Sequence, residues 1–181
     1  MGTSTQQASP PLLPLPIRER SSRHEHRVRR FSVAYALLAE LRTVATDQTG
    51  ARSAIAYACR LHEVPVPAVT FHGRRGPHTG YCLAPAWHVR ITIGESAVRR
   101  WEERKGRAWP EEGMIRLGTQ TALGTIAHEL GHHLVNQRER PGVPPHGKLW
   151  VGWFDTASMA LVDWCRRLDL DLGGLHRFST A

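Results

Sequence analysis

The stretch GTIAHELGHHLVNQ (residues 124–137) decides how the rest of the chain is interpreted. Its apolar residues surround the polar ones at helical spacing, which predicts a largely buried helix. His128 and His132 are four residues apart, so they project from one face of that helix, one turn from each other. Two such imidazoles can bind one zinc ion, and Glu129 beside them can take a proton from a water on that ion. The HExxH pattern therefore predicts a metal site with Glu129 as general base.

A catalytic zinc site takes three protein ligands and keeps one position open, so a third ligand must come from elsewhere. The metzincin arrangement needs glycine at position 135 and histidine at 138, but Val135 and Arg138 stand there. No glutamate follows residue 139, so a later helix could supply only Asp155 or Asp163 as an acidic ligand.

His146 is the best candidate for the third ligand. It lies in PPHGKLW (144–150), directly after a short Pro/Gly loop that turns the chain back towards the helix. The two prolines restrict the approach and Gly147 allows the backbone to come close. Trp150 is expected to seat the following helix against the HExxH helix. His133 lies about 100° round the helix from His132, so it cannot point at the same metal. We expect its ring to be exposed; the alternative is a ring that forms a hydrogen bond behind the metal ligands.

The remaining sequence predicts further helices and strands around this site. Apolar spacing predicts helices over 31–46, over 51–62 with Ile55, Ala58, Cys59 and Leu61 inward, and over 149–168. The HExxH helix is expected from 118–121 to about 137, capped by Thr119 or Thr121. Strands are expected as an edge strand within 64–72 and as a hairpin within 81–94, joined around Ala84–Pro85. The polar stretch 99–113 is expected to be a surface excursion. The fold class is α+β, with a small hairpin or sheet packed against the HExxH helix and helices flanking it.

Composition limits the organisation of the 181-residue chain and its setting. We expect a disordered basic N-terminal tail (1–28), one domain (29–172) and a C-terminal tail (173–181). Cys59, Cys82 and Cys165 are odd in number and far apart, which disfavours a disulfide scaffold or a zinc ribbon. We find neither a secretion signal nor a membrane span, which favours a soluble cytoplasmic protein. The net charge of +8 favours polyanionic neighbours but proves none.

The motifs HELGH and HGKLW together resemble those of the SprT-like (Spartan-type) zinc metallopeptidases, and the order of elements over 31–168 resembles that family more loosely. The resemblance implies a zincin-like fold, Zn²⁺ bound by His128, His132 and His146, and Glu129 as general base. It implies a protein or peptide substrate, including proteins attached to DNA. Some relatives carry a C-terminal zinc ribbon, which the three dispersed cysteines of this chain cannot build, so DNA would have to be held by the basic N-terminal arm.

Three other interpretations remain beside a SprT-like peptidase. ImmA/IrrE-type regulatory peptidases of phages and mobile elements also read HELGHH, but usually take an acidic third ligand, for which Asp155 and Asp163 are the candidates. The chain could instead bind DNA and carry an idle zinc site. It could also hold a structural zinc ion, closed by a fourth ligand such as Asp155. For a peptidase, we expect the substrate to pair along WHVRITIG (87–94), and Tyr81, His78 and His88 are candidates to stabilise the oxyanion.

Overall fold

The computed structural model describes residues 12–14, 32, 41–42, 44–73 and 79–168, and within them the chain is mixed α and β. The predicted tails 1–28 and 173–181 therefore lie almost wholly outside the described residues. The described strands form two small sheets. In the first, β2 (Val44–Thr46) pairs antiparallel with both β1 (Leu12–Pro14) and β6 (Thr121–Ala122). In the second, β5 (Met114–Gly118) lies between a parallel β3 (Ala68–His72) and an antiparallel β4 (Gly80–Leu83).

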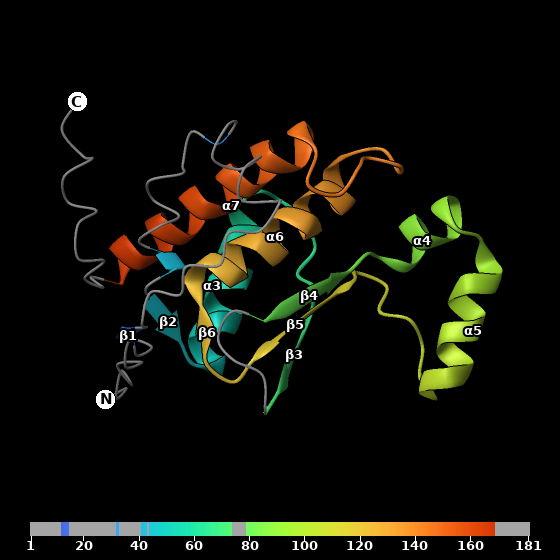
Figure 1. Cartoon of the computed structure of the whole chain (residues 1–181), viewed down its shortest axis with the longest axis horizontal. Coiled ribbons are helices and arrows are strands. Elements are labelled where there is room, and N and C mark those ends of the chain that lie inside the picture. Colours follow the sequence, from blue (N-terminus) through green and yellow to red (C-terminus); the bar gives the residue numbers. More distant parts are fainter. Residues whose placement is uncertain (1–11, 15–31, 33–40, 43, 74–78, 169–181) are drawn as a thin grey trace, which may run out of the picture.

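The main core forms where three helices meet the second sheet (Figure 1). α6 (Leu123–Arg138) runs through the middle of this core, and α7 (Lys148–Arg167) returns alongside it. α3 (Gln48–Leu61) packs against both, and its N-terminus is capped by Asp47, whose carboxylate accepts a hydrogen bond of 2.8 Å from the Gly50 amide. Ile115 and Leu117 of β5 enter the same core, so the central strand is anchored directly beneath α6.

Most of the expected elements are present, but several details differ. The strand within 64–72 is β3, which lies at an edge of its sheet as predicted, and the helices predicted over 51–62 and 149–168 are α3 and α7. The helix predicted over 31–46 ends before Val44, because residues 44–46 pair as β2; residues 33–40 lie outside the described part. Leu61, expected inward, is 50% exposed at the end of α3. The cap of α6 is Ala122, because the Thr121 hydroxyl instead donates to the Gly118 carbonyl.

The second strand of the expected hairpin is a helix, α4 (Ala86–Thr92). The alternation of Trp87, Val89, Ile91 and Ile93 predicted a strand, but Ile91 and Ile93 are 67% and 70% exposed. Burial instead follows a helical spacing of three residues, through Ala86 and Val89, and Pro85 precedes the first turn. The strand that does pair with β4 is β5, which was not predicted between the polar stretch and the HExxH helix.

α4 and α5 (Glu95–Lys105) form an arm beside the main body (Figure 1). This arm, residues 86–112, has its own small core of Ala86, Val89, Val98 and Trp109. Trp109 also fastens the arm by hydrogen bonds, donating from its indole to the Ala84 carbonyl at 2.9 Å and from its amide to Glu102 at 2.8 Å. Residues 99–105 of the predicted surface excursion are therefore helical within α5, and Trp109 packs the rest against the core of the arm.

Candidate metal centre

α6 carries the first half of the centre. His128 and His132 lie one turn apart on this helix, and their Nε2 atoms are 3.3 Å from each other. The helix holds its position because apolar residues on its other sides are buried in the main core, including Ile126, Leu130 and Leu134. The predicted HExxH face is therefore formed, with both imidazoles pointing to one spot.

His146 completes the cluster from the loop between α6 and α7. Its Nε2 lies 3.0 Å from that of His132 and 3.2 Å from that of His128. The loop brings the ring there with His146 itself in the left-handed region, at φ 58°, whereas the adjacent Gly147 has an ordinary φ of −77°. A non-glycine residue in this region is uncommon and costs backbone energy, which packing around the ring must offset.

The three histidines can hold a metal ion, and among the described residues they are the only such group. Hydrogen bonds alone do not explain a triangle of ring nitrogens at 3.0–3.3 Å, because each Nε2 either donates one hydrogen or accepts one. A shared cation would satisfy all three lone pairs together. The donor set and its spacing therefore fit a metal.

Two aromatic rings of α7, those of Trp150 and Phe154, pack beneath the three histidines. The Trp150 ring is 1% exposed and its centroid lies 4.9, 5.1 and 4.6 Å from those of His128, His132 and His146. Phe154, one turn further along α7, stacks on Trp150 at 5.1 Å. Trp150 thus seats α7 against α6 as the sequence predicted, and it packs against all three imidazoles.

Glu129 lies on the side of α6 that faces the second sheet. It is 6% exposed, and burial raises the pKa of its carboxyl to about 7. The strand β4 passes directly beside it at Gly80. A buried carboxyl with a pKa near neutrality can both accept and release a proton at physiological pH.

The other predicted ligands lie elsewhere. Asp155 accepts a hydrogen bond from the Ser32 hydroxyl, and Asp163 accepts one from the Tyr57 hydroxyl and another from Arg167 at 3.1 Å. Neither aspartate belongs to the cluster of three histidines. Both carboxylates instead hold neighbouring segments against α7.

His133 corrects the expectation of an exposed ring. It is fully buried on the far side of α6, where its Nε2 lies 2.8 Å from the Pro65 carbonyl oxygen, and burial lowers its pKa. No pattern in the sequence pointed to this contact, because the loop before β3 that covers the ring is distant along the chain. His133 therefore ties α6 to that loop rather than to a metal.

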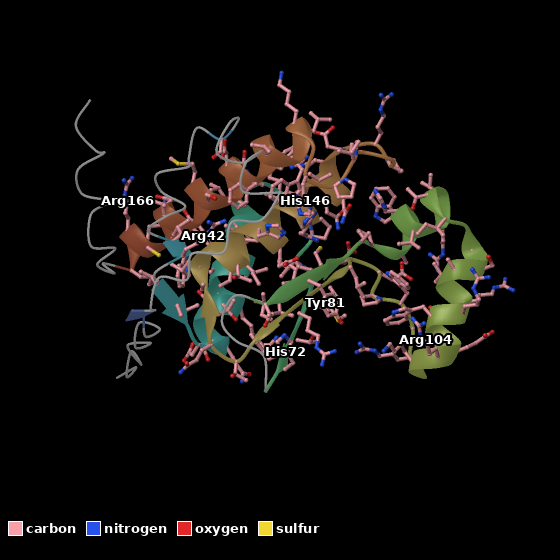
Figure 2. All side chains as sticks on the ribbon, viewed as in Figure 1. Arg42, His72, Tyr81, Arg104, His146 and Arg166 are labelled. Carbon is pink, nitrogen blue, oxygen red and sulfur yellow. The ribbon has the colours of Figure 1, made fainter. Side chains whose placement is uncertain are left out.

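The candidates for oxyanion stabilisation are not brought to the centre by any described contact. Gly80 and Cys82 lie on the face of β4 towards α6, because Gly80 lies against Glu129 and the Glu129 charge helps to raise the pKa of Cys82. Successive side chains of a strand point to opposite faces, so Tyr81 points away from α6. In Figure 2 His146 lies beside α6 and α7, whereas Tyr81 lies lower, on the second sheet. His88 packs edge-on against Trp87 on α4, and His78 lies outside the described residues.

Comparisons of the chain with protein-family models, curated proteins and solved structures give no match. Within the described residues, no helix is both long and apolar enough to cross a membrane. Inference about function therefore depends on the geometry of the centre.

Proposed function

We propose that the chain is a zinc-dependent metallopeptidase of zincin-like fold, similar to the SprT-like family, that hydrolyses peptide bonds of protein substrates. One observation supports this above the others: His146, 14 residues beyond His132, brings its Nε2 within 3.0–3.2 Å of both histidines of the HExxH helix. Two nitrogens bound tetrahedrally to zinc at 2.0–2.1 Å lie about 3.3–3.4 Å apart, and three imidazoles suit zinc well.

In this proposal the chain's residues divide the work between binding and proton transfer. His128, His132 and His146 bind the ion through Nε2. A bound zinc ion supplies a water of lowered pKa and polarises the scissile carbonyl. The Glu129 carboxylate accepts the proton of the attacking water and passes it to the nitrogen of the leaving amine. Its buried position, with the pKa raised to about 7, suits this exchange near neutral pH.

β4 replaces 87–94 as the proposed binding edge for the substrate, because residues 86–92 are helical. β4 is one of the two edge strands of its sheet, and it is the one that passes beside Glu129. An extended peptide could add to this edge by main-chain hydrogen bonds, which depend little on the peptide's sequence. We therefore propose extended segments of proteins as substrates. The cytoplasmic location of the protein stays a prediction.

The set of three histidine donors favours a catalytic site over a closed structural zinc site and over a site with an acidic third ligand. No fourth histidine, cysteine, aspartate or glutamate joins the cluster among the described residues, as a closed structural site would need. A regulatory peptidase with an acidic third ligand is disfavoured because His146 takes that place while Asp155 and Asp163 bind Ser32 and Tyr57. An idle zinc site in a DNA-binding protein would show the same geometry without turnover.

The test compares Glu129→Gln with wild type for zinc content and for cleavage of a labelled, denatured protein. We expect one zinc per chain in both and a loss of cleavage of at least about 10²-fold in the variant, because the amide cannot accept the proton. Glu139→Gln is the matched control, since Glu139 ends the same helix and accepts a bond from Trp153 at 2.8 Å. Normal cleavage by Glu129→Gln would contradict the mechanism.

His146→Ala tests the third ligand. We expect its zinc content to fall well below one per chain, whereas His88→Ala on the arm should keep zinc at the wild-type level. If His146→Ala retained zinc and activity, the proposed centre would be wrong.

A further inference from the structure

β4 makes an unusually close approach to α6 at one residue, Gly80. A Cβ atom at this position would lie 3.0 Å from Cγ of Glu129 and 3.1 Å from its Oε1. It would also lie 3.1 Å from Cδ2 of Leu117 on the neighbouring strand. Real Cβ atoms are rarely so close to any neighbour, so a side chain at position 80 could enter only if Glu129 or Leu117 moved.

Backbone conformation does not account for glycine at position 80. Gly80 is not among the glycines with positive φ, and it lies at the start of a regular strand, paired opposite Leu117. Glycine within a strand is otherwise unfavourable, because it restricts an unusually free backbone and packs no side chain. The close approach of Glu129 is therefore the physical reason for glycine here.

The carboxylate has little freedom to yield. Glu129 is buried, Cγ is near the root of its side chain, and Leu117 at the adjacent position is fully buried in the main core. A methyl group at position 80 would thus press on the part of Glu129 that sets the direction of its carboxylate.

We propose that Gly80 is a positioning residue for Glu129: the absence of a side chain on β4 leaves the space that holds the carboxylate at its working place. This inference rests on the proposed peptidase function for its kinetic consequence but not for the contact itself. A displacement of a few tenths of an ångström at a proton-transferring group is enough to slow the reaction, since misplacement by 1 Å costs about 10²-fold.

A double-mutant cycle on stability tests the contact without any assay of activity. Thermal unfolding is measured for wild type, Gly80→Ala, Glu129→Ala and the double variant, all saturated with zinc. We expect Gly80→Ala to lower Tm by about 3 °C or more in the wild-type background and by less than about 1 °C beside Glu129→Ala, which has no Cγ. An equal loss in both backgrounds would place the clash at Leu117 and overturn the proposal.

Kinetics then test the positioning. Gly80→Ala should keep one zinc per chain and a KM within about twofold of wild type, while kcat falls about tenfold or more. The matched control is Gly73→Ala in the turn directly after β3, where a Cβ would meet nothing within 4 Å. An unchanged kcat in an active wild-type background would overturn the positioning role. If wild type itself cleaves nothing, the proposed function fails, while the stability cycle still decides whether Gly80 makes room for Glu129.

Discussion

Trp150 shows how much one side chain contributes to the centre. Its ring touches all three imidazoles, yet its buried indole Nε1 has no hydrogen-bond partner among the described residues. The contribution is therefore packing. We expect Trp150→Phe to lower the free energy of unfolding by about 1–2 kcal/mol and to keep zinc, and Trp150→Ala to lower it by about 3–5 kcal/mol and to weaken zinc binding. Denaturant unfolding and zinc titration measure both; equal zinc affinity in the two variants would contradict this role.

At the level of single residues, the sequence predicted the centre well where local geometry decides. The four-residue spacing places His128 and His132 together in any α-helix, and the loop length made His146 a reasonable third ligand. Burial by distant segments was not predictable. The His133 ring was expected to be exposed because the spacing along its own helix says nothing of the distant loop that covers it. The sequence likewise contained no indication of the contact between Gly80 and Glu129, which lie 49 positions apart in the chain.

The contact between α6 and α7 is the element-scale feature on which the centre depends. A Cβ at Gly131 would lie 3.1–3.3 Å from the Cα, Cβ and N atoms of Phe154, so glycine permits the close approach of the two helices. We expect Gly131→Ala to lower the free energy of unfolding by about 1–2 kcal/mol and to weaken zinc binding, because α7 and its Trp150 must move away. Urea unfolding and zinc titration measure the two effects.

Gly152→Ala is the control for this prediction, since it makes the same change within α7, where a Cβ meets nothing within 4 Å. Alanine is the better helix former, so the control should be neutral or should stabilise by up to about 1 kcal/mol. If Gly131→Ala behaved like Gly152→Ala, close helix packing would not be what the glycine provides.

Elements were predictable from the sequence when periodicity and burial agreed. α3 and α7 have long apolar faces, and their predicted bounds are close to the observed ones. α4 was misassigned because a short stretch with apolar residues at alternate positions also fits a helix that is buried on only one side. β5 was missed because its five residues follow a polar stretch, and only its partners β3 and β4 reveal it as the central strand.

At the scale of the whole molecule, the arm is packed separately from the metal centre. Its core contains residues of α4, α5 and the segment up to Trp109, and none of the main-core residues around the histidines. We expect Trp109→Ala to increase hydrogen exchange over 86–112 because it removes both the packing and the indole bond to Ala84. Zinc content should remain at one per chain. Loss of zinc in this variant would mean that the arm and the centre are coupled.

The whole chain carries an excess of positive charge, and two regions are candidates for binding a polyanion. Residues 18–30 contain six arginines but lie outside the described residues. On the described part, Arg116 shares the outer face of the second sheet with Tyr81 and Thr70, and Arg107 reaches Met114 of the same strand at 3.9 Å. No described carboxylate forms an ion pair with either arginine.

Substitutions in these two regions distinguish DNA binding through the N-terminal arm (residues 18–30) from DNA binding through the second sheet. If the arm holds DNA, changing its six arginines to alanine should weaken binding of an oligonucleotide. The dependence of log K on log[salt] should also flatten, by about 0.7–0.9 for each phosphate that the arm no longer neutralises. Substitution is preferable to deletion of residues 1–30, because that deletion would also remove β1 (Leu12–Pro14), which pairs with β2. Arg107→Ala with Arg116→Ala should then change little. The reverse result would assign DNA binding to the sheet, on the face opposite Glu129. If neither set of arginine substitutions nor the salt concentration changes the affinity for the oligonucleotide, DNA is not a partner. The positive charge is then a general property of the surface.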